Sequence, residues 1–177
     1  MCIRDRLIQN GCVLISQHAD SMGAPTACET AGVPNISYNG STQAACPNTF
    51  IVSSRIDWAP YYEYAITAAM NGEAIDADWT GTLSTGSVVL TDLNTDVAAE
   101  GTQEAVDAAW SSIKDGSLKV FDTSKFTVGG QTVTEYEVNF SIIDFESGDV
   151  VFEGPTENVI SDGAFQESVY RSAPYFD

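Results

Sequence analysis

Basic residues are scarce in this sequence, and long apolar runs are missing. Of its 177 residues, 7 are Lys or Arg and 25 are Asp or Glu, which gives a formal net charge of −18 at pH 7. Nucleic acids and anionic membrane surfaces are bound through clustered cations, so we expect neither as a partner. No run of about 18 apolar residues occurs, so the sequence predicts no membrane-spanning helix.

Several motifs for metals, nucleotides and nucleophiles are also missing. The cysteines Cys2, Cys12, Cys28 and Cys46 form no C-x2-C pair, which argues against a zinc site. They could form two disulfides, but we expect buried or unpaired thiols. There is no calcium-binding loop, no Gly-rich phosphate loop and no G-x-S-x-G motif. We therefore predict no metal site and no cofactor.

The chain does have enough apolar residues for one buried core, and its charge is uneven. Hydrophobic residues make up 44% of the sequence. Residues 1–60 carry three basic and four acidic residues, a balance of −1, whereas residues 61–177 carry four basic and 21 acidic residues, a balance of −17. A solvated acidic surface is the simplest interpretation of this second part.

The first part of the chain alternates short apolar runs with amphipathic segments. Strands are expected at residues 12–16, 35–38 and 50–54, and helices at residues 20–31, 57–71 and 97–114. Each predicted helix is followed closely by a glycine: Gly32, Gly72 and Gly116. Such alternation is typical of an α/β fold, a parallel sheet with helices on both faces.

The pattern changes after residue 117. Gly129-Gly130 lies between two short β-prone segments and predicts a hairpin with a two-residue turn. Residues 135–140 and 150–152 are further expected strands. We therefore interpret residues 118–160 as a β-rich elaboration, and find no usable periodicity in residues 161–177.

Polar side chains follow each predicted strand of the first part, where ligands bind in open α/β sheets. Gln17, His18 and Asp20 follow the first strand, Asn39 follows the second, and Trp58 follows the third. Polar groups with a tryptophan suit a small polar ligand that has a flat apolar face.

Other interpretations of these residues remain open. His18 and Asp20 could act as a general base pair in a hydrolase, although no nucleophile motif accompanies them. Asp20 or Ser21 could simply cap a helix, and Trp58 could pack at a helix start.

At these loops the sequence resembles a known family. Residues 11–21 read GCVLISQHADS and resemble the GxDVISQHTDS segment of the basic membrane protein (BMP) family, the purine nucleoside receptor A-like substrate-binding lipoproteins of ABC transporters. The likeness continues in order through residues 31–33, 36–39, 46–47, 57–62, 79–81, 86–90, 113–116, 120–123, 160–163 and 170–177.

The resemblance implies one lobe of a type I periplasmic-binding-protein-like fold. On that basis we expect a non-family extension at residues 1–6, an α/β ligand-binding lobe at residues 7–117, and a β-rich C-terminal part of the same lobe at residues 118–177. By the same resemblance, we expect the family's first lobe, export signal and lipid-attachment cysteine to be missing from this sequence.

The resemblance also implies a function without chemical turnover. The chain would belong to the extracytoplasmic, lipid-anchored solute-binding component of an ABC importer, with the permease as its partner and a purine nucleoside as its ligand. By position, the ligand-binding residues would be Gln17, His18, Asp20, Asn39, Trp58 and Gly81. Asp20 would bind the ribose hydroxyls, and Trp58 or His18 would stack on the base. A secreted hydrolase and a non-catalytic extracellular interaction module are the alternatives.

Overall fold

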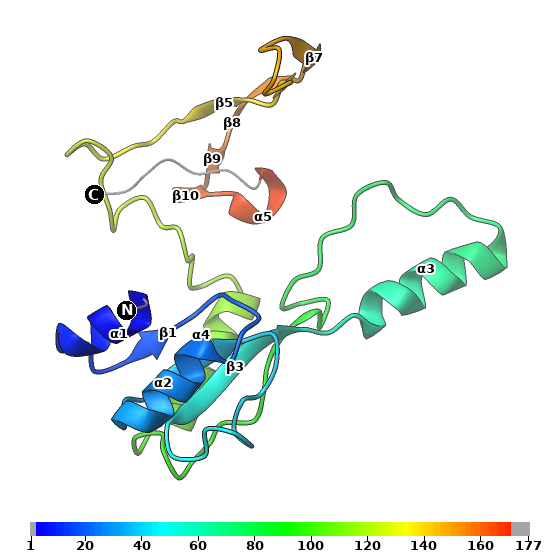
Figure 1. Cartoon of the computed structure of the whole chain (residues 1–177). Coiled ribbons are helices and arrows are strands. Elements are labelled where there is room, and N and C mark those ends of the chain that lie inside the picture. The colour runs from blue at the N-terminus through cyan, green and yellow to red at the C-terminus, as the bar shows by residue number, and fades with distance from the viewer. Residues whose placement is uncertain (1–2, 171–177) are drawn as a thin grey trace. The chain divides into compact units, whose positions relative to one another are not determined.

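The computed structural model describes residues 3–170, so Cys2 and the end of the last family-like segment, residues 171–177, lie outside the described residues. The chain divides into two compact units, Met1–Lys114 and Asp115–Asp177. Figure 1 shows the course of the chain through both units. Within residues 3–170, no helix is long and apolar enough to cross a bilayer.

A four-stranded sheet organises the first unit. Its strands are β1 (Ile15–Ser16), β2 (Asn35–Tyr38), β3 (Phe50–Ile56) and β4 (Val88–Leu90), in that spatial order. The first three strands run parallel, which confirms the predicted α/β class. β4 pairs antiparallel with β3 and adds an edge that the sequence pattern did not indicate.

The first strand is shorter than predicted. Residues 12–16 were expected to form a buried strand, but only Ile15–Ser16 pair with β2. Ile15 is 4% exposed, whereas Val13 is 82% exposed. The reason is that β1 is an edge strand with a single neighbour, and the pairing starts only at Asn35, the first residue of β2.

Between residues 3 and 114 the first unit has four helices: α1 (Ile3–Gln9), α2 (Gly23–Ala31), α3 (Ala59–Asn71) and α4 (Thr102–Lys114). Gly32 and Gly72 end α2 and α3 in the left-handed conformation, with φ of 68° and 72°, as predicted. α1 was not expected from the sequence.

The starts of two helices differ from the prediction. The N-cap of α2 is Met22, so neither Asp20 nor Ser21 caps it. α4 begins at Thr102 instead of near residue 97. A separate turn closes first, in which Ala98 donates its backbone N–H to the Asn94 carbonyl, and Gly101 then takes a φ of 82°.

The predicted apolar stripes are less buried than the sequence indicated. Of the stripe on α3 (Tyr61, Tyr64, Ala65, Ala68 and Ala69), only Ala68 is buried. Figure 1 shows α3 extending away from the sheet of its own unit. The stripe on α4 (Val106, Ala109, Trp110 and Ile113) contains no buried residue. Helical periodicity identified these faces, but it could not show whether a partner covers them.

The interior of the first unit combines apolar and polar side chains. Phe50, Cys28 and Cys46 are fully buried. Asn35 and Thr49 are polar, yet only 2% and 1% of their surface is exposed. The amide Nδ2 of Asn35 donates to Thr49 Oγ1 at 3.1 Å, so these buried polar groups satisfy each other. Cys12 and Cys46 have free thiols.

Up to residue 170, the second unit contains three short antiparallel strand pairs and one helical turn. β5 (Glu137–Asn139) pairs with β8 (Thr156–Asn158), β6 (Ile142–Ile143) with β7 (Val150–Phe152), and β9 (Ile160–Ser161) with β10 (Ala164–Phe165). α5 (Glu167–Tyr170) follows β10. The predicted β-rich character of residues 118–160 is confirmed.

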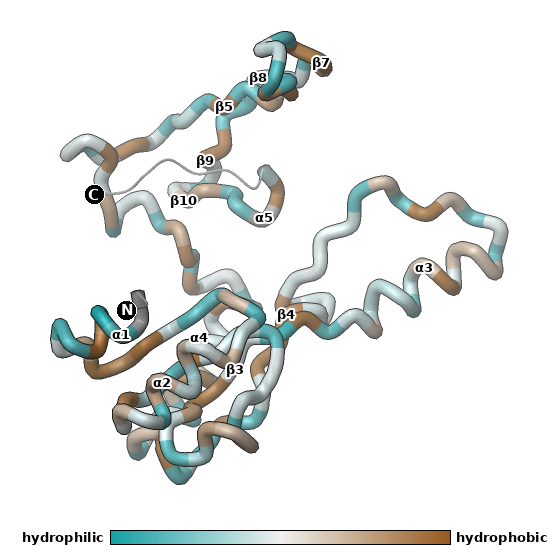
Figure 2. The backbone as a smooth tube through the Cα atoms, viewed as in Figure 1, coloured by the Kyte–Doolittle hydropathy of each residue, from teal (hydrophilic) through white to brown (hydrophobic). Residues whose placement is uncertain are grey.

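The second unit also has a glycine turn and a small apolar core. Gly129 and Gly130 have φ of 56° and 74° and form the predicted two-residue turn. The predicted hairpin is wrong beyond this turn, because residues 126–128 and 131–133 form no strands and are joined by an isolated bridge between Val128 and Gln131. The core of this unit is Val159, Ile160 and Phe165. Figure 2 shows hydrophobic residues also at β7, where they are exposed instead of packed.

Candidate functional site

A pocket of about 330 Å³ lies where β1 and β2 end. Three predicted site residues, Gln17, Asp20 and Asn39, line it. The remaining lining residues come from the end of β2 and from the same two loops: Ala19, Ser21, Met22, Tyr38, Gly40, Ser41 and Thr42. The predicted convergence of the loops at the carboxyl edge is therefore present for β1 and β2.

The backbone explains why these loops meet. The backbone N–H of Gln17 donates to the Ile36 carbonyl at 3.2 Å, which holds the first loop beside β2. The backbone N–H of Asn39 donates to the Ser54 carbonyl of β3. Asn39 has a φ of 66°, a left-handed conformation that asparagine tolerates better than most residues and that turns the chain out of β2.

The polar groups of the pocket are partly fixed. The Nδ2 of Asn39 lies 3.5 Å from Asp20 Oδ1, at the long limit of a hydrogen bond. This weak contact joins the loop after β1 to the loop after β2. The Nε2 of Gln17 donates to the Ser21 carbonyl at 3.2 Å. Asp20 and Asn39 are exposed. The pocket thus presents a carboxylate acceptor beside two amides, a set that suits ligand hydroxyl groups.

His18 is next to this pocket, but its contacts are not those expected of a catalytic base. Its ring stacks on Tyr38, with centroids 4.1 Å apart and planes at 30°. Within residues 3–170 no hydrogen bond or ion pair joins His18 to Asp20, and Asp20 has Asn39 as its partner instead. The geometry therefore gives the His18–Asp20 hydrolase hypothesis no support.

Trp58 and Gly81 do not line this pocket. Trp58 is 55% exposed and contacts the rings of Tyr61 and Tyr62 at the start of α3. Gly81 packs beside Trp79, whose ring lies 5.3 Å from that of Tyr61. The structure therefore brings Trp58 and Gly81 to one aromatic cluster, separate from the group of Gln17, Asp20 and Asn39.

The loop that leads to this cluster is fixed by Asp57. Its Oδ1 accepts the backbone N–H of Ala59 at 3.0 Å, at the first residue of α3. Its other oxygen pairs with Arg55 at 3.6 Å. Asp57 thus helps to fix the start of α3, but the N-cap residue is Trp58 and not Asp57, which the sequence offers as a capping residue.

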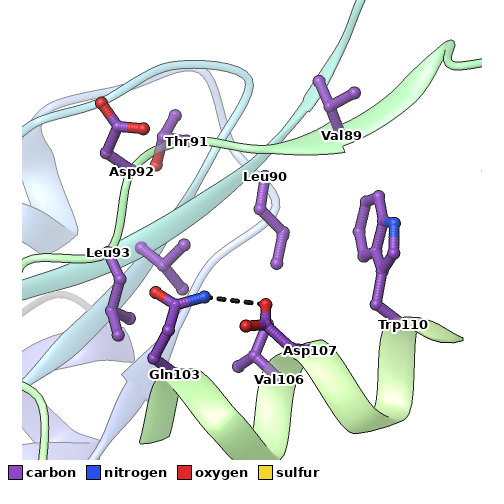
Figure 3. Close-up of a pocket in the computed structure, with 10 residues that line it drawn as sticks. Val89, Leu90, Thr91, Asp92, Leu93, Gln103, Val106, Asp107 and Trp110 are labelled. Carbon is purple, nitrogen blue, oxygen red and sulfur yellow. Dashed lines mark hydrogen bonds between the residues drawn. The ribbon is translucent and has the colours of Figure 1, made fainter.

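A larger pocket of about 470 Å³ was not anticipated by the sequence analysis. It lies between β4 and α4 and is shown in Figure 3. It is lined by Val52, Val89, Leu90, Thr91, Asp92, Leu93, Gln103, Val106, Asp107 and Trp110. The apolar stripe of α4 was the available signal, but periodicity alone indicates burial and not an open space.

A third pocket of about 300 Å³ contains a basic side chain. It is lined by Ser41 and Gln43 after β2, by Arg55 of β3, and by Leu90, Thr91 and Asp92 at the end of β4. Ser41 also lines the pocket of Gln17, Asp20 and Asn39, so the two pockets share a wall.

The half-buried Glu29 carboxylate and the buried Cys46 thiol have shifted pKa values. The pKa of Glu29 is lowered, chiefly by the hydrogen bond from Thr49 Oγ1 at 2.7 Å and also by bonds from Asn48. Burial, together with the nearby charge of Glu29, raises the pKa of the Cys46 thiol. Among residues 3–170, no three His, Cys, Asp or Glu side chains are grouped so as to hold a metal ion.

Comparison with known proteins gives the class to which the relatives of this chain belong. The solved structure of an ABC transporter system solute-binding protein from Conexibacter woesei matches it with a TM-score of 0.53 and 23% identity, over 66% of this chain and 40% of that one. The mixed α/β fold of this chain is thus consistent with a periplasmic-binding-protein-like fold.

A curated relative carries a more particular name. It is the "Putative ABC transporter glucose-binding protein TsgA13" of Haloferax volcanii, 30% identical over 121 residues, which are 68% of this chain and 30% of that protein. The homologues are therefore ABC transporter solute-binding proteins, and the chain spans less than half the length of either relative. No family model matches the sequence.

Proposed function

We propose that this chain is part of a solute-binding protein that captures a small, hydroxyl-bearing solute for an ABC transporter. The supporting observation is the pocket at the ends of β1 and β2, where Gln17, Asp20 and Asn39 meet. A carboxylate and two amides can bind vicinal hydroxyls in a directional way. The pocket is also at the edge of the sheet where open α/β folds bind ligands.

The proposed ligand is a purine nucleoside. The resemblance of residues 11–21 to the basic membrane protein family supports this choice. The stacked rings of His18 and Tyr38 offer a flat surface next to the hydroxyl-binding groups. The name of the Haloferax relative mentions glucose. A hexose is therefore the main competitor, because it presents similar hydroxyls without a base.

The remaining parts of the proposal follow from the same class of relatives. The protein would bind its ligand without chemical turnover, would act outside the cytoplasm, and would deliver the ligand to a membrane permease. A lipid anchor in the parent protein is the attachment that the family resemblance implies.

A thermal melt with a panel of solutes tests the choice of ligand. The panel contains adenosine, inosine, uridine, ribose and glucose at millimolar concentration. A ligand at 100 times its dissociation constant that binds only the folded state adds about 2.7 kcal/mol, enough to raise the melting temperature by several degrees. We expect the shift with adenosine or inosine and not with ribose.

Each other outcome of the melt has a definite meaning. A shift with glucose alone would replace the nucleoside by a hexose. Conversion of a nucleoside into free base during incubation would favour the hydrolase instead. The absence of any shift across the panel would contradict solute capture by this chain.

A further inference from the structure

The pocket between β4 and α4 is a second candidate ligand site, distinct from the site proposed above. Its volume of about 470 Å³ is within the range of small-molecule pockets, about 300–1,000 Å³. In Figure 3, Leu90 from the strand and Gln103, Asp107 and Trp110 from the helix project into the space between the two elements.

Most of the wall of this pocket is apolar. Leu90, Val106 and Trp110 are half-buried, as are the neighbouring lining residues Val52, Val89 and Leu93. Aliphatic side chains opposite an indole ring suit a flat or cyclic hydrocarbon group. An indole face also attracts a cation, more strongly than the other aromatic side chains do.

The charged groups of the pocket all have the same sign. Asp92 and Asp107 line it, whereas none of the ten lining residues is Lys, Arg or His. The Nε2 of Gln103 donates to Asp107 Oδ1 at 2.9 Å, which fixes the carboxylate on α4. Within residues 3–170, neither carboxylate is paired with a basic side chain. Arg55 lines the neighbouring pocket together with Asp92, so Asp107 is the carboxylate farther from a basic side chain. The two lining carboxylates would repel an anionic ligand and attract a cationic one.

We propose that this pocket binds a small organic amine with a ring-shaped apolar body. The ring would lie against Trp110 and the aliphatic wall, and the ammonium group would bind the carboxylate of Asp107, with Asp92 adding a second negative charge. This site shares no lining residue with the pocket of Gln17, Asp20 and Asn39, so the two proposals stand or fall separately.

The experiment compares two probes that have the same ring and opposite charges, phenethylamine and 3-phenylpropionate. Binding is followed by the indole N–H signals in a two-dimensional ¹H–¹⁵N NMR spectrum. The three tryptophans, Trp58, Trp79 and Trp110, are assigned with single Trp→Phe variants. We expect phenethylamine to shift the Trp110 signal in a saturable way, and 3-phenylpropionate to leave it unchanged.

Two variants and one control test the assigned residues. Asp107→Asn should weaken phenethylamine binding about fivefold or more, because it removes the charged acceptor. Val106→Phe keeps every charge but fills the pocket, and should also weaken binding. Glu63→Gln removes one negative charge from the exposed side of α3 and should leave the affinity unchanged. A thermal melt checks that each variant is folded.

Three results would overturn the proposal. The first is the absence of a saturable Trp110 shift at millimolar phenethylamine. The second is equal binding of the two probes, which would mean that the carboxylates play no part. The third is an unchanged affinity in both Asp107→Asn and Val106→Phe, which would place the amine elsewhere.

Discussion

At the scale of single residues, Glu29 shows how one polar side chain joins two segments of the first unit. Its carboxylate accepts hydrogen bonds from Thr49 Oγ1 at 2.7 Å and from Asn48 Nδ2 at 2.6 Å. Both donors lie just before β3, whereas Glu29 is on α2. These hydrogen bonds thus hold α2 against the segment that leads into β3.

The pH dependence of this contribution follows from its lowered pKa. Hydrogen bonds, first that from Thr49 and then those from Asn48, hold the folded-state pKa of Glu29 below its ordinary value of 4.5. The stability that ionised Glu29 contributes is therefore fully present above pH 4.5, and it is lost as the pH falls through the folded-state pKa.

We predict that Glu29→Gln lowers the melting temperature at pH 7 and that the difference from the wild type shrinks below pH 4.5. Melts monitored by circular dichroism between pH 3 and pH 7 measure both effects. A difference that stays constant or grows toward low pH would contradict this role. Glu104→Gln, an exposed change on α4, provides the control.

Gly81 is a second residue whose identity the structure explains. A Cβ at this position would lie 2.5 Å from the Cβ of Ser87 and 3.0 Å from Trp79 Cζ3, so the backbone would have to move. We predict that Gly81→Ala lowers the free energy of unfolding by about 1–3 kcal/mol, as overpacking does.

Urea unfolding of Gly81→Ala and Gly40→Ala measures this effect. Gly40 is the matched control for stability, because a Cβ there meets no atom within 4 Å. Equal stability of the two variants would contradict the close packing at Gly81. The resemblance had assigned Gly81 a ligand contact, whereas the structure shows a steric reason for glycine at this position.

At the scale of elements, the hairpin of β6 and β7 has apolar side chains without a core. Ile142, Val150, Val151 and Phe152 are each more than half exposed. Exposed apolar strands are prone to pair with other chains, and charges on such strands prevent it.

We therefore predict that Val151→Lys reduces self-association and leaves the melting temperature within about 1 °C of the wild type, since little apolar area is lost. Light scattering over a concentration series, combined with a thermal melt, measures both quantities. A clear loss of stability would show that Val151 is packed in solution. An unchanged tendency to associate would exclude this hairpin as the contact.

The elements also show which features the sequence could predict. The bounds of β2 and the glycines that end α2 and α3 were predicted correctly, because they depend on local patterns of alternation and backbone conformation. Burial was predicted less well. Val13 and most of the stripe on α3 are exposed, because burial depends on which partner covers a face.

At the scale of the whole molecule, the two units have different interiors. The first unit buries a polar network, with Asn35 and Thr49 beside Phe50, whereas the second packs Val159 and Phe165 into an apolar cluster. The α/β class and the β-rich second part were both predictable from composition and periodicity.

The candidate site was predictable only in part. The rule that ligands bind at the carboxyl ends of strands brought Gln17, Asp20 and Asn39 together correctly. The same rule did not place Trp58 correctly. Trp58 contacts the tyrosine rings at the start of α3, a helix that extends away from the sheet. The pocket beside α4 depends on the antiparallel strand β4, which no local pattern indicated.

The most direct test of the central claim is a calorimetric titration of adenosine into the wild type, Asp20→Asn and Asp96→Asn. Asp96 is exposed, belongs to the same unit and does not line the pocket of Asp20, so its variant matches the charge change. We predict binding that Asp20→Asn weakens about tenfold or more and that Asp96→Asn leaves unchanged. Equal affinity in all three proteins would contradict a solute site at the ends of β1 and β2.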